Sequence, residues 1–126
     1  SSLDFAGAES EWRSLDPPDE GADPEVFFQR EWLRSLLAEA VEDLRRECEA
    51  RGRKVRFAVF SRYELEGEKP TYAALAADLG VPETKVTNDL HAARKRLRAL
   101  VLERLRSLCA DEAEYLAEAK TLLGDP

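Results

Sequence analysis

The chain has 126 residues, of which 36% are charged and 8% are aromatic, and its formal net charge at pH 7 is −7. This length suits one small domain with a tail, and the composition suits a soluble, mostly helical protein. Apolar runs are only a few residues long, so the sequence predicts neither a membrane span nor the core of a signal peptide.

The negative charge is concentrated at the two ends of the chain. Residues 1–25 hold eight acidic and one basic side chain, and residues 107–126 hold five acidic and one basic side chain. The middle, 26–106, therefore has 17 basic against 13 acidic residues, a net charge of +4, and 85–106 alone carries +5. A basic stripe on one element is the electrostatic footprint expected of a nucleic-acid-binding protein.

Three parts are expected along the chain. Residues 1–25 contain "DPPDEGADP", with many acids and few large apolar groups, which indicates a flexible acidic linker or tail with Trp12 and Leu15 as local anchors. Residues 26–108 are expected to form a DNA-binding domain, and 109–126 a C-terminal helical extension.

The first predicted helix covers 26–50, where apolar residues recur at helical spacing and Gly52 provides a stop. The segment 55–65 alternates like a strand but also has a helical apolar face. We predict a helix there, because no second strand is available to pair its backbone groups. The residues expected in the core from these two segments include Trp32, Leu36, Phe57, Phe60 and Tyr63.

Three further helices are predicted, so the fold class is all-α. Thr71 can cap a helix over 72–79, and Gly80 ends it. Pro82 suits the start of the next helix, 83–108. A last helix covers 111–123, with Asp111 as N-cap and Gly124 as stop. Its expected apolar face consists of Tyr115, Leu116, Ala119, Leu122 and Leu123.

A short alanine-rich helix, a turn with glycine and a basic second helix form the pattern of a helix-turn-helix. Apolar residues of the second helix define a buried stripe: Val86, Leu90, Ala93 and Leu97. At 100° per residue, Thr84, Asn88, His91 and Lys95 lie almost opposite this stripe. Asp89 lies on the protein side, where it can pair with an arginine instead of meeting DNA.

Each candidate residue has an expected role in DNA binding. Asn88 suits bidentate contact with adenine, and hydroxyl and imidazole groups suit contacts with base edges. Basic side chains suit contacts with phosphates. The predicted base contacts are Thr84, Thr87, Asn88 and His91, and the predicted phosphate contacts are Lys85, Arg94, Lys95 and Arg98.

The segment "FAVFSRYELEGEKPTYAALAADLGVPETKVTNDLHAARKRLRALV", with the preceding "EWLRSLLAEAVEDLRREC", resembles the fourth region of bacterial sigma factors of the extracytoplasmic-function type. The family shows "Y-x-x-[IL]-A-x-x-L-G" followed by "V-x-x-x-L-H-x-A-R-x-x-L". The matching positions are Tyr72, Leu75, Ala76, Leu79, Gly80, Val81, Val86, Leu90, His91, Ala93, Arg94 and Leu97. The similarity covers most of 26–106.

The resemblance implies recognition of the upstream promoter element and docking on the flap of the RNA polymerase β subunit, with an anti-sigma factor or another regulator as a further partner. It also implies a cytoplasmic, nucleoid-associated protein. The second sigma region is not in this sequence, so the chain is expected to be a fragment or a reduced, upstream-reading module. Many family members carry a basic residue where this chain has Thr87 and Asp89, and an arginine at Ala92, so a weaker electrostatic grip is expected.

The same residues also bear on other classes of function. One histidine and two distant cysteines predict no metal site, no cofactor and no catalytic residue, so an enzyme is not expected. The rivals are a sigma-like interaction module that does not read DNA, and a free-standing regulator acting as a dimer. Cys48 and Cys109 are expected to be buried, reduced thiols, with a disulfide as the alternative.

Overall fold

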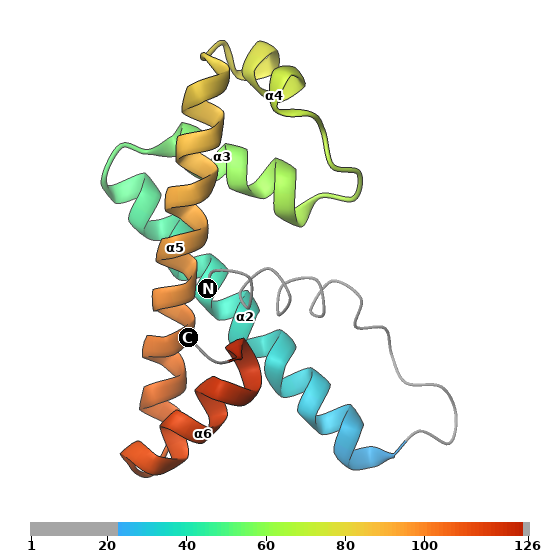
Figure 1. Cartoon of the computed structure of the whole chain (residues 1–126), viewed down its shortest axis with the longest axis vertical. Helices are drawn as coiled ribbons and strands as arrows, with labels where there is room; N and C mark the ends of the chain where they lie inside the picture. The colour runs from blue at the N-terminus through green and yellow to red at the C-terminus, as the bar shows by residue number, and fades with distance from the viewer. Residues whose placement is uncertain (1–22, 125–126) are drawn as a thin grey trace. The chain divides into compact units, whose positions relative to one another are not determined.

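The computed structural model describes residues 23–124, and this part of the chain contains five α-helices and one π-helical turn but no strand. The prediction of an all-α protein is confirmed. The helices follow one another as shown in Figure 1. Their bounds are α2 Pro24–Ala50, α3 Lys54–Phe60, η1 Ser61–Leu65, α4 Tyr72–Leu79, α5 Glu83–Leu108 and α6 Glu112–Leu123.

The predicted acidic linker lies outside the described residues, except for its last three, and so do Trp12 and Leu15. Helix α2 begins at Pro24, two residues before the predicted start. Proline suits this place because its missing N–H has no helical partner to lose in the first turn. The Asp23 carboxylate accepts a hydrogen bond from the Glu25 N–H at 2.9 Å, which satisfies one of the free donors of that turn.

The described chain divides into two compact units. We call residues 42–97 the central unit, and residues 23–41 together with 98–124 the end unit. Both long helices, α2 and α5, pass from one unit into the other. The expected boundaries at 26 and 108 follow the order of the chain, whereas these units follow contacts between helices that are distant in sequence.

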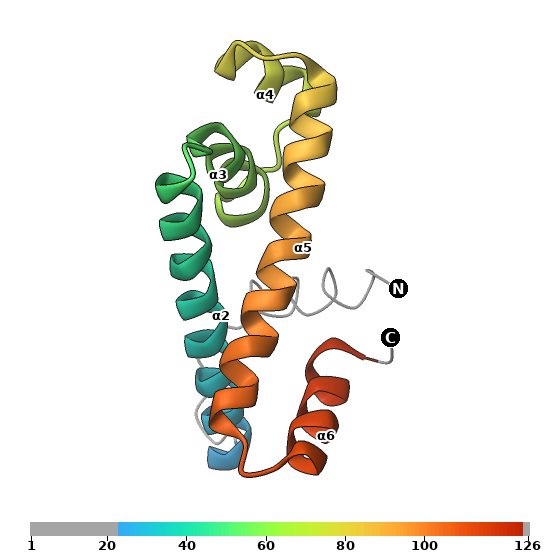
Figure 2. The same cartoon turned by 90° about the vertical axis from the view of Figure 1, so that its left-hand side faces the viewer.

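The core of the central unit comes from all of its α-helices. The predicted stripe of α5 is confirmed, because each of its four side chains is buried. In Figure 2, α3 lies between the end of α2 and the first half of α5. Burying each large apolar side chain contributes roughly 1.5–3 kcal/mol. The buried apolar residues of this unit are Leu44, Cys48, Val59, Phe60, Leu75, Ala76, Val86, Leu90, Ala93 and Leu97.

The ambiguous segment 55–65 is helical, as predicted, but it is not one regular helix. After α3 the chain continues as η1, where the Glu66 N–H donates to the Ser61 carbonyl at 3.1 Å, a bond that spans five residues. Phe60 is fully buried, whereas Phe57 and Tyr63 are half-buried. The π-helical turn leaves Glu64 buried, which the apolar pattern did not predict.

Helices α4 and α5 have the predicted bounds and the predicted signals at their ends. The Thr71 hydroxyl accepts a hydrogen bond from the Ala74 N–H at 3.0 Å. Gly80 has a φ of 68°, in the left-handed region that favours glycine. This conformation lets the N–H groups of Gly80 and Val81 both donate to the Ala76 carbonyl, which closes α4 and redirects the chain into α5.

The end unit consists of the first half of α2, the second half of α5, and α6. Asp111 caps α6 as predicted, because its carboxylate accepts a hydrogen bond from the Glu114 N–H at 2.8 Å. Gly124 ends the helix. The buried apolar side chains of this unit are Leu36, Leu37, Ala40, Leu100, Val101, Leu105, Tyr115 and Leu123.

Two core assignments in this unit are wrong. Trp32 is 41% exposed and Leu116 is 58% exposed. Helix α6 buries Tyr115 and Leu123 but leaves Leu116 exposed, although Leu116 lies only about 20° around the helix from Leu123 and two turns before it. The large apolar side chains that are exposed in the described chain all belong to the end unit: Val26, Phe28, Trp32, Leu108 and Leu116.

Both cysteines are free thiols, so the alternative of a disulfide is wrong. Cys48 is buried, and this burial raises the pKa of its thiol. Cys109 is only partly buried, which corrects the expectation for that residue. Within residues 23–124, no helix combines the length and the apolar character that crossing a bilayer requires.

Candidate nucleic-acid interface

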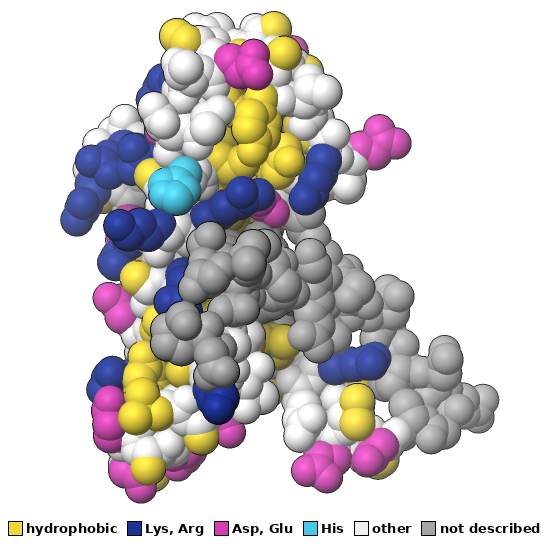
Figure 3. Space-filling model, in the orientation of Figure 1, with side chains coloured by type: hydrophobic (Ala, Val, Ile, Leu, Met, Phe, Trp, Pro, Cys, Tyr) yellow, Lys and Arg dark blue, Asp and Glu magenta, His cyan; other side chains and the backbone are white. Residues whose placement is uncertain are grey.

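The first half of α5 exposes a polar face opposite its buried stripe. We call this the outward face, and it consists of Thr84, Lys85, Thr87, Asn88, His91 and Lys95, all of which are exposed. In Figure 3, His91, the only histidine of the chain, lies on the surface among Lys and Arg side chains. The helical periodicity therefore assigned the exposed and buried sides of this helix correctly.

Four side chains of the outward face are available to a ligand. Among residues 23–124, none of them has a hydrogen-bond or ion-pair partner: Thr84, Asn88, His91 and Lys95. Thr87 differs, because its hydroxyl donates to the Glu83 carbonyl at 3.3 Å. That hydroxyl can still accept a hydrogen bond through its oxygen.

Asp89 is turned away from the outward face, as predicted. Its side chain is buried, and its Oδ1 accepts a hydrogen bond from Nε of Arg56 at 3.2 Å. The Lys85 ammonium lies 2.9 Å from Oδ2, in an ion pair without hydrogen-bond alignment. Asp89 is thus paired with an arginine, and its charge is compensated from two sides.

Arg94 is paired with Glu64 inside the central unit. Its Nε donates to Oε1 of Glu64 at 2.7 Å, and its Nη2 also contacts that oxygen. The guanidinium lies 5.5 Å from the centre of the Tyr63 ring, within the range of a cation–π interaction. Because Glu64 is 3% exposed, the pair neutralises a buried carboxylate and joins α5 to η1.

Two tyrosines support this pair. The rings of Tyr63 and Tyr72 meet edge to face, with their centres 5.3 Å apart, and the Lys69 ammonium lies 5.0 Å from the centre of the Tyr63 ring. Burial is the main cause that raises the pKa of Tyr72. These contacts join η1 to the start of α4, and they hold the two helices that precede α5 together.

The residues predicted to contact phosphates therefore differ in whether they are already paired with a carboxylate. Lys95 is exposed and unpaired among the described residues, Lys85 is paired with Asp89, and Arg94 is paired with Glu64. Arg98 belongs to the end unit, so it is not part of the surface defined here. The roles assigned to all eight candidate residues stay predictions.

Sequence reasoning missed a second basic cluster, in the segment "RGRKVR" at 51–56. Arg51, Arg53 and Lys54 are exposed, and within the described chain none of them has a hydrogen-bond or ion-pair partner. Four cations in six residues were the available signal. The sum over 26–106 includes these four cations, but the acids around them hide the local excess of positive charge.

Within residues 23–124, no group of three or more metal-ligating side chains comes together. Comparison with protein-family models, with curated proteins and with solved structures gave no significant match.

Proposed function

We propose that this chain is a DNA-contacting module that recognises the upstream promoter element in transcription initiation. The main observation behind the proposal is that one acidic group of α5 is buried, whereas neutral polar and basic groups around it are exposed. Asp89 is buried against Arg56, while Thr84, Asn88, His91 and Lys95 point outward without a partner in the described chain. A helix whose acid is neutralised and whose amide and cation are unpaired suits a polyanion that also presents base edges.

The connection between α4 and α5 supports this proposal. In a helix-turn-helix, a short helix and a tight turn place the N-terminal part of the second helix in the major groove. The left-handed Gly80 closes α4 after eight residues, and the outward face begins at Thr84, in the first turn of α5. The free polar groups thus lie in the part of the helix that a reading helix presents to DNA.

The partners follow from the resemblance to the fourth region of sigma factors. We propose promoter DNA and the β flap of RNA polymerase as the main partners, and an anti-sigma factor or another regulator as a further one. A chain with these partners would be cytoplasmic and associated with the nucleoid.

The proposal is tested by selecting duplexes from a random library with the full chain, and by titrating the selected duplex and a scrambled duplex at several salt concentrations. We expect the selected duplex to bind more tightly. Asn88→Ala should cost about 1–3 kcal/mol on the selected duplex only, and Lys95→Ala should reduce the salt slope by about one unit on both. Lys120→Ala, which removes the same charge from α6, is the matched control. Absence of binding at low salt would contradict the proposal.

A second candidate is a helical interaction module that binds polymerase or a regulator without reading DNA. The observation that favours it is the apolar surface of the end unit. A groove of about 630 Å³ is lined there by Trp32, Leu108 and Leu122, and five large apolar side chains of this unit are exposed. Exposed apolar patches of this kind are typical of protein-binding sites. Binding of the isolated β flap, together with no DNA binding, would select this candidate.

A further inference from the structure

A small hollow in the central unit is surrounded by arginines. It has a volume of about 90 Å³, and four of its lining residues are arginines: Arg51, Arg53, Arg56 and Arg96. Glu47 is the only acidic residue of its lining, and Cys48 forms part of the wall. Such a volume accommodates several waters or one tetrahedral oxyanion.

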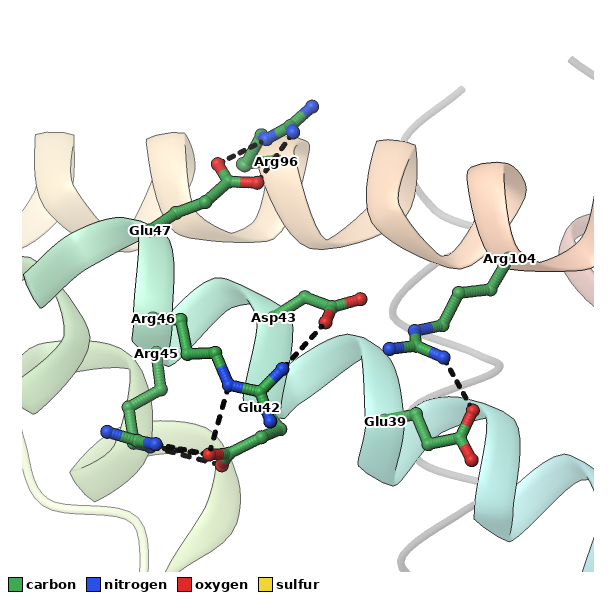
Figure 4. Close-up of polar contacts among 8 residues, drawn as sticks. All are labelled: Glu39, Glu42, Asp43, Arg45, Arg46, Glu47, Arg96 and Arg104. Carbon is green, nitrogen blue, oxygen red and sulfur yellow. Dashed lines mark hydrogen bonds and ion pairs between the residues drawn. The ribbon is translucent and has the colours of Figure 1, made fainter. Parts of the chain in front are cut away.

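Two of the four arginines are already neutralised. Arg96 donates two parallel hydrogen bonds to Glu47, from Nε at 2.7 Å and from Nη2 at 2.6 Å, which Figure 4 shows. Arg56 donates to Asp89, a carboxylate that it shares with Lys85. Two cations of the lining are thus fixed in place by carboxylates that they already satisfy.

The other two arginines have no such partner. Within the described chain, Arg51 and Arg53 form no hydrogen bond or ion pair through their side chains, and both are exposed. The lining therefore carries four cations against the single carboxylate of Glu47, which Arg96 binds directly and whose pKa the charge of Arg51 also helps to lower. Like charges brought together in this way repel one another, so an anion that enters between them is attracted.

The backbone at the end of α2 holds this arrangement. Gly52 has a φ of 69°. Its N–H donates to the Glu49 carbonyl at 3.2 Å, and the Arg53 N–H donates to the Cys48 carbonyl at 2.7 Å. This pair of hydrogen bonds is a Schellman motif, which reverses the chain directly after the helix. Arg51 and Arg53, on either side of the glycine, thereby line the same hollow.

We propose that this hollow binds a phosphate group, held by the guanidinium groups of Arg51 and Arg53 in a setting pre-formed by the Arg96–Glu47 and Arg56–Asp89 pairs. Arginine suits this ligand because its planar fork binds phosphate oxygens with two parallel hydrogen bonds. The phosphate can come from a nucleic-acid backbone or from a small phosphorylated molecule. The inference goes beyond the proposed function, since a phosphate bound here does not require α5 to read a sequence.

The test uses the full chain and two kinds of probe. Inorganic phosphate and pyrophosphate are titrated calorimetrically, and a scrambled duplex is titrated at several salt concentrations. The variant is Arg51→Ala with Arg53→Ala, which leaves the backbone hydrogen bonds of the turn in place. Lys54→Ala is the matched control, because this lysine is exposed at the start of α3, directly after Arg53, but does not line the hollow. Far-UV circular dichroism checks that the variants fold.

Two outcomes support the proposal and identify the source of the phosphate. The first is saturable binding of free phosphate or pyrophosphate, which indicates a small phosphorylated ligand. The double variant should weaken this binding about tenfold or more, and Lys54→Ala should weaken it less than about twofold. The second is that free phosphate does not bind, but the double variant reduces the salt slope on duplex DNA by about two units and the control reduces it by less than one. This outcome indicates that the ligand is a nucleic-acid backbone.

Other outcomes overturn the proposal. The first is that free phosphate does not bind and the double variant leaves the salt slope unchanged. The second is that Lys54→Ala has as large an effect as the double variant, which would mean that only the general positive charge of this surface matters. The double variant Arg51→Lys with Arg53→Lys keeps the charge but removes the planar guanidinium groups. It should bind phosphate more tightly than the double alanine variant and more weakly than the wild type. Failure of the proposed function is distinguishable, because it would remove the effects of Asn88→Ala and Lys95→Ala but leave phosphate binding intact.

Discussion

The central unit and the end unit use their charged and apolar side chains differently. In the central unit, two carboxylates that are almost fully buried join separate helices, in the pairs Arg56–Asp89 and Arg94–Glu64, beside the more exposed pair Arg62–Asp78. In the end unit, the pairs Arg104–Glu39 and Arg106–Glu112 have carboxylates that are more than half exposed. The large apolar side chains that remain exposed in the described chain belong to the end unit alone.

This difference indicates two kinds of surface. The central unit uses most of its acids internally and leaves unpaired cations and amides outside, which suits a hydrophilic, anionic ligand. The end unit leaves aromatic and aliphatic groups outside, which suits an apolar partner. The two units thus present surfaces of different chemistry. Two predictions test this contrast, two more sharpen the account of the central unit, and they run from the largest expected effect to the smallest.

The first prediction compares the same substitution in the two units. Phe60 is fully buried in the central unit, and Phe28 is 68% exposed in the end unit. We expect Phe60→Ala to lower the free energy of unfolding by about 3–5 kcal/mol, because it leaves a cavity, and Phe28→Ala to change it by less than about 0.5 kcal/mol. Urea denaturation followed by circular dichroism measures both. Equal losses would show that the exposed ring is in fact covered.

The second prediction compares a buried ion pair with an exposed one. Glu64→Ala leaves Arg94 without its carboxylate, and we expect a loss of about 1–3 kcal/mol in the free energy of unfolding. Glu112→Ala removes the exposed partner of Arg106, and little change is expected. The same urea experiment applies, with Glu64→Gln as the variant that preserves shape. A loss for Glu112→Ala as large as that for Glu64→Ala would contradict the contrast.

The third prediction concerns the two glycines that close helices in the central unit. Gly52 and Gly80 have φ values of 69° and 68°, and a Cβ added at either would meet no atom within 4 Å. We expect alanine at either position to cost about 1–2 kcal/mol through backbone strain alone. Gly67→Ala is the control, because Gly67 has no positive φ and its Cβ would also be unobstructed. Thermal unfolding should separate the control from the two strained variants.

The smallest effect is expected at the half-exposed pair of Glu47 and Arg96. The hydrogen bond from Arg96 lowers the pKa of Glu47 from an ordinary value of 4.5. Because the folded pKa lies below the unfolded one, the pair stabilises the folded state above pH 4.5, and this contribution is lost as the pH falls through the folded pKa. Glu47→Gln should therefore be less stable than the wild type at neutral pH.

The stability gap between Glu47→Gln and the wild type should close as the pH falls below about 4.5. Arg96→Gln should show the same closing gap, because it removes the other half of the pair. Urea denaturation at pH values from 3 to 7, about one unit apart, measures both gaps. A gap that does not depend on pH would mean that the ion pair contributes nothing to stability.

Much of the fold could be predicted from the sequence because its signals are local. Helix ends are set by neighbouring residues, so Thr71, Gly80 and Asp111 fixed three of them. The direction of a side chain on a helix follows from the 100° step, and this placed Asp89 on the buried side of α5.

What could not be predicted depends on residues that are distant in the chain. Apolar periodicity identifies a face, but it does not reveal whether another element covers that face, so Trp32 and Leu116 were wrongly assigned to the core. The partner of Arg94 lies 30 residues away, and no local pattern identifies it. The hollow lined by arginines requires α5 to lie beside the turn after α2, a contact that spans about forty residues.

The π-helical turn at 61–65 has a consequence for changes in chain length. Its hydrogen-bonded ring encloses one residue more than a ring of an α-helix, and it sets the rotational phase of the side chains of η1 that follow α3. Deleting one residue there would restore a regular α-helix and rotate Glu64 by about 100°, away from Arg94. A change of chain length in this segment would therefore remove the buried acid from its partner even if every remaining residue were kept.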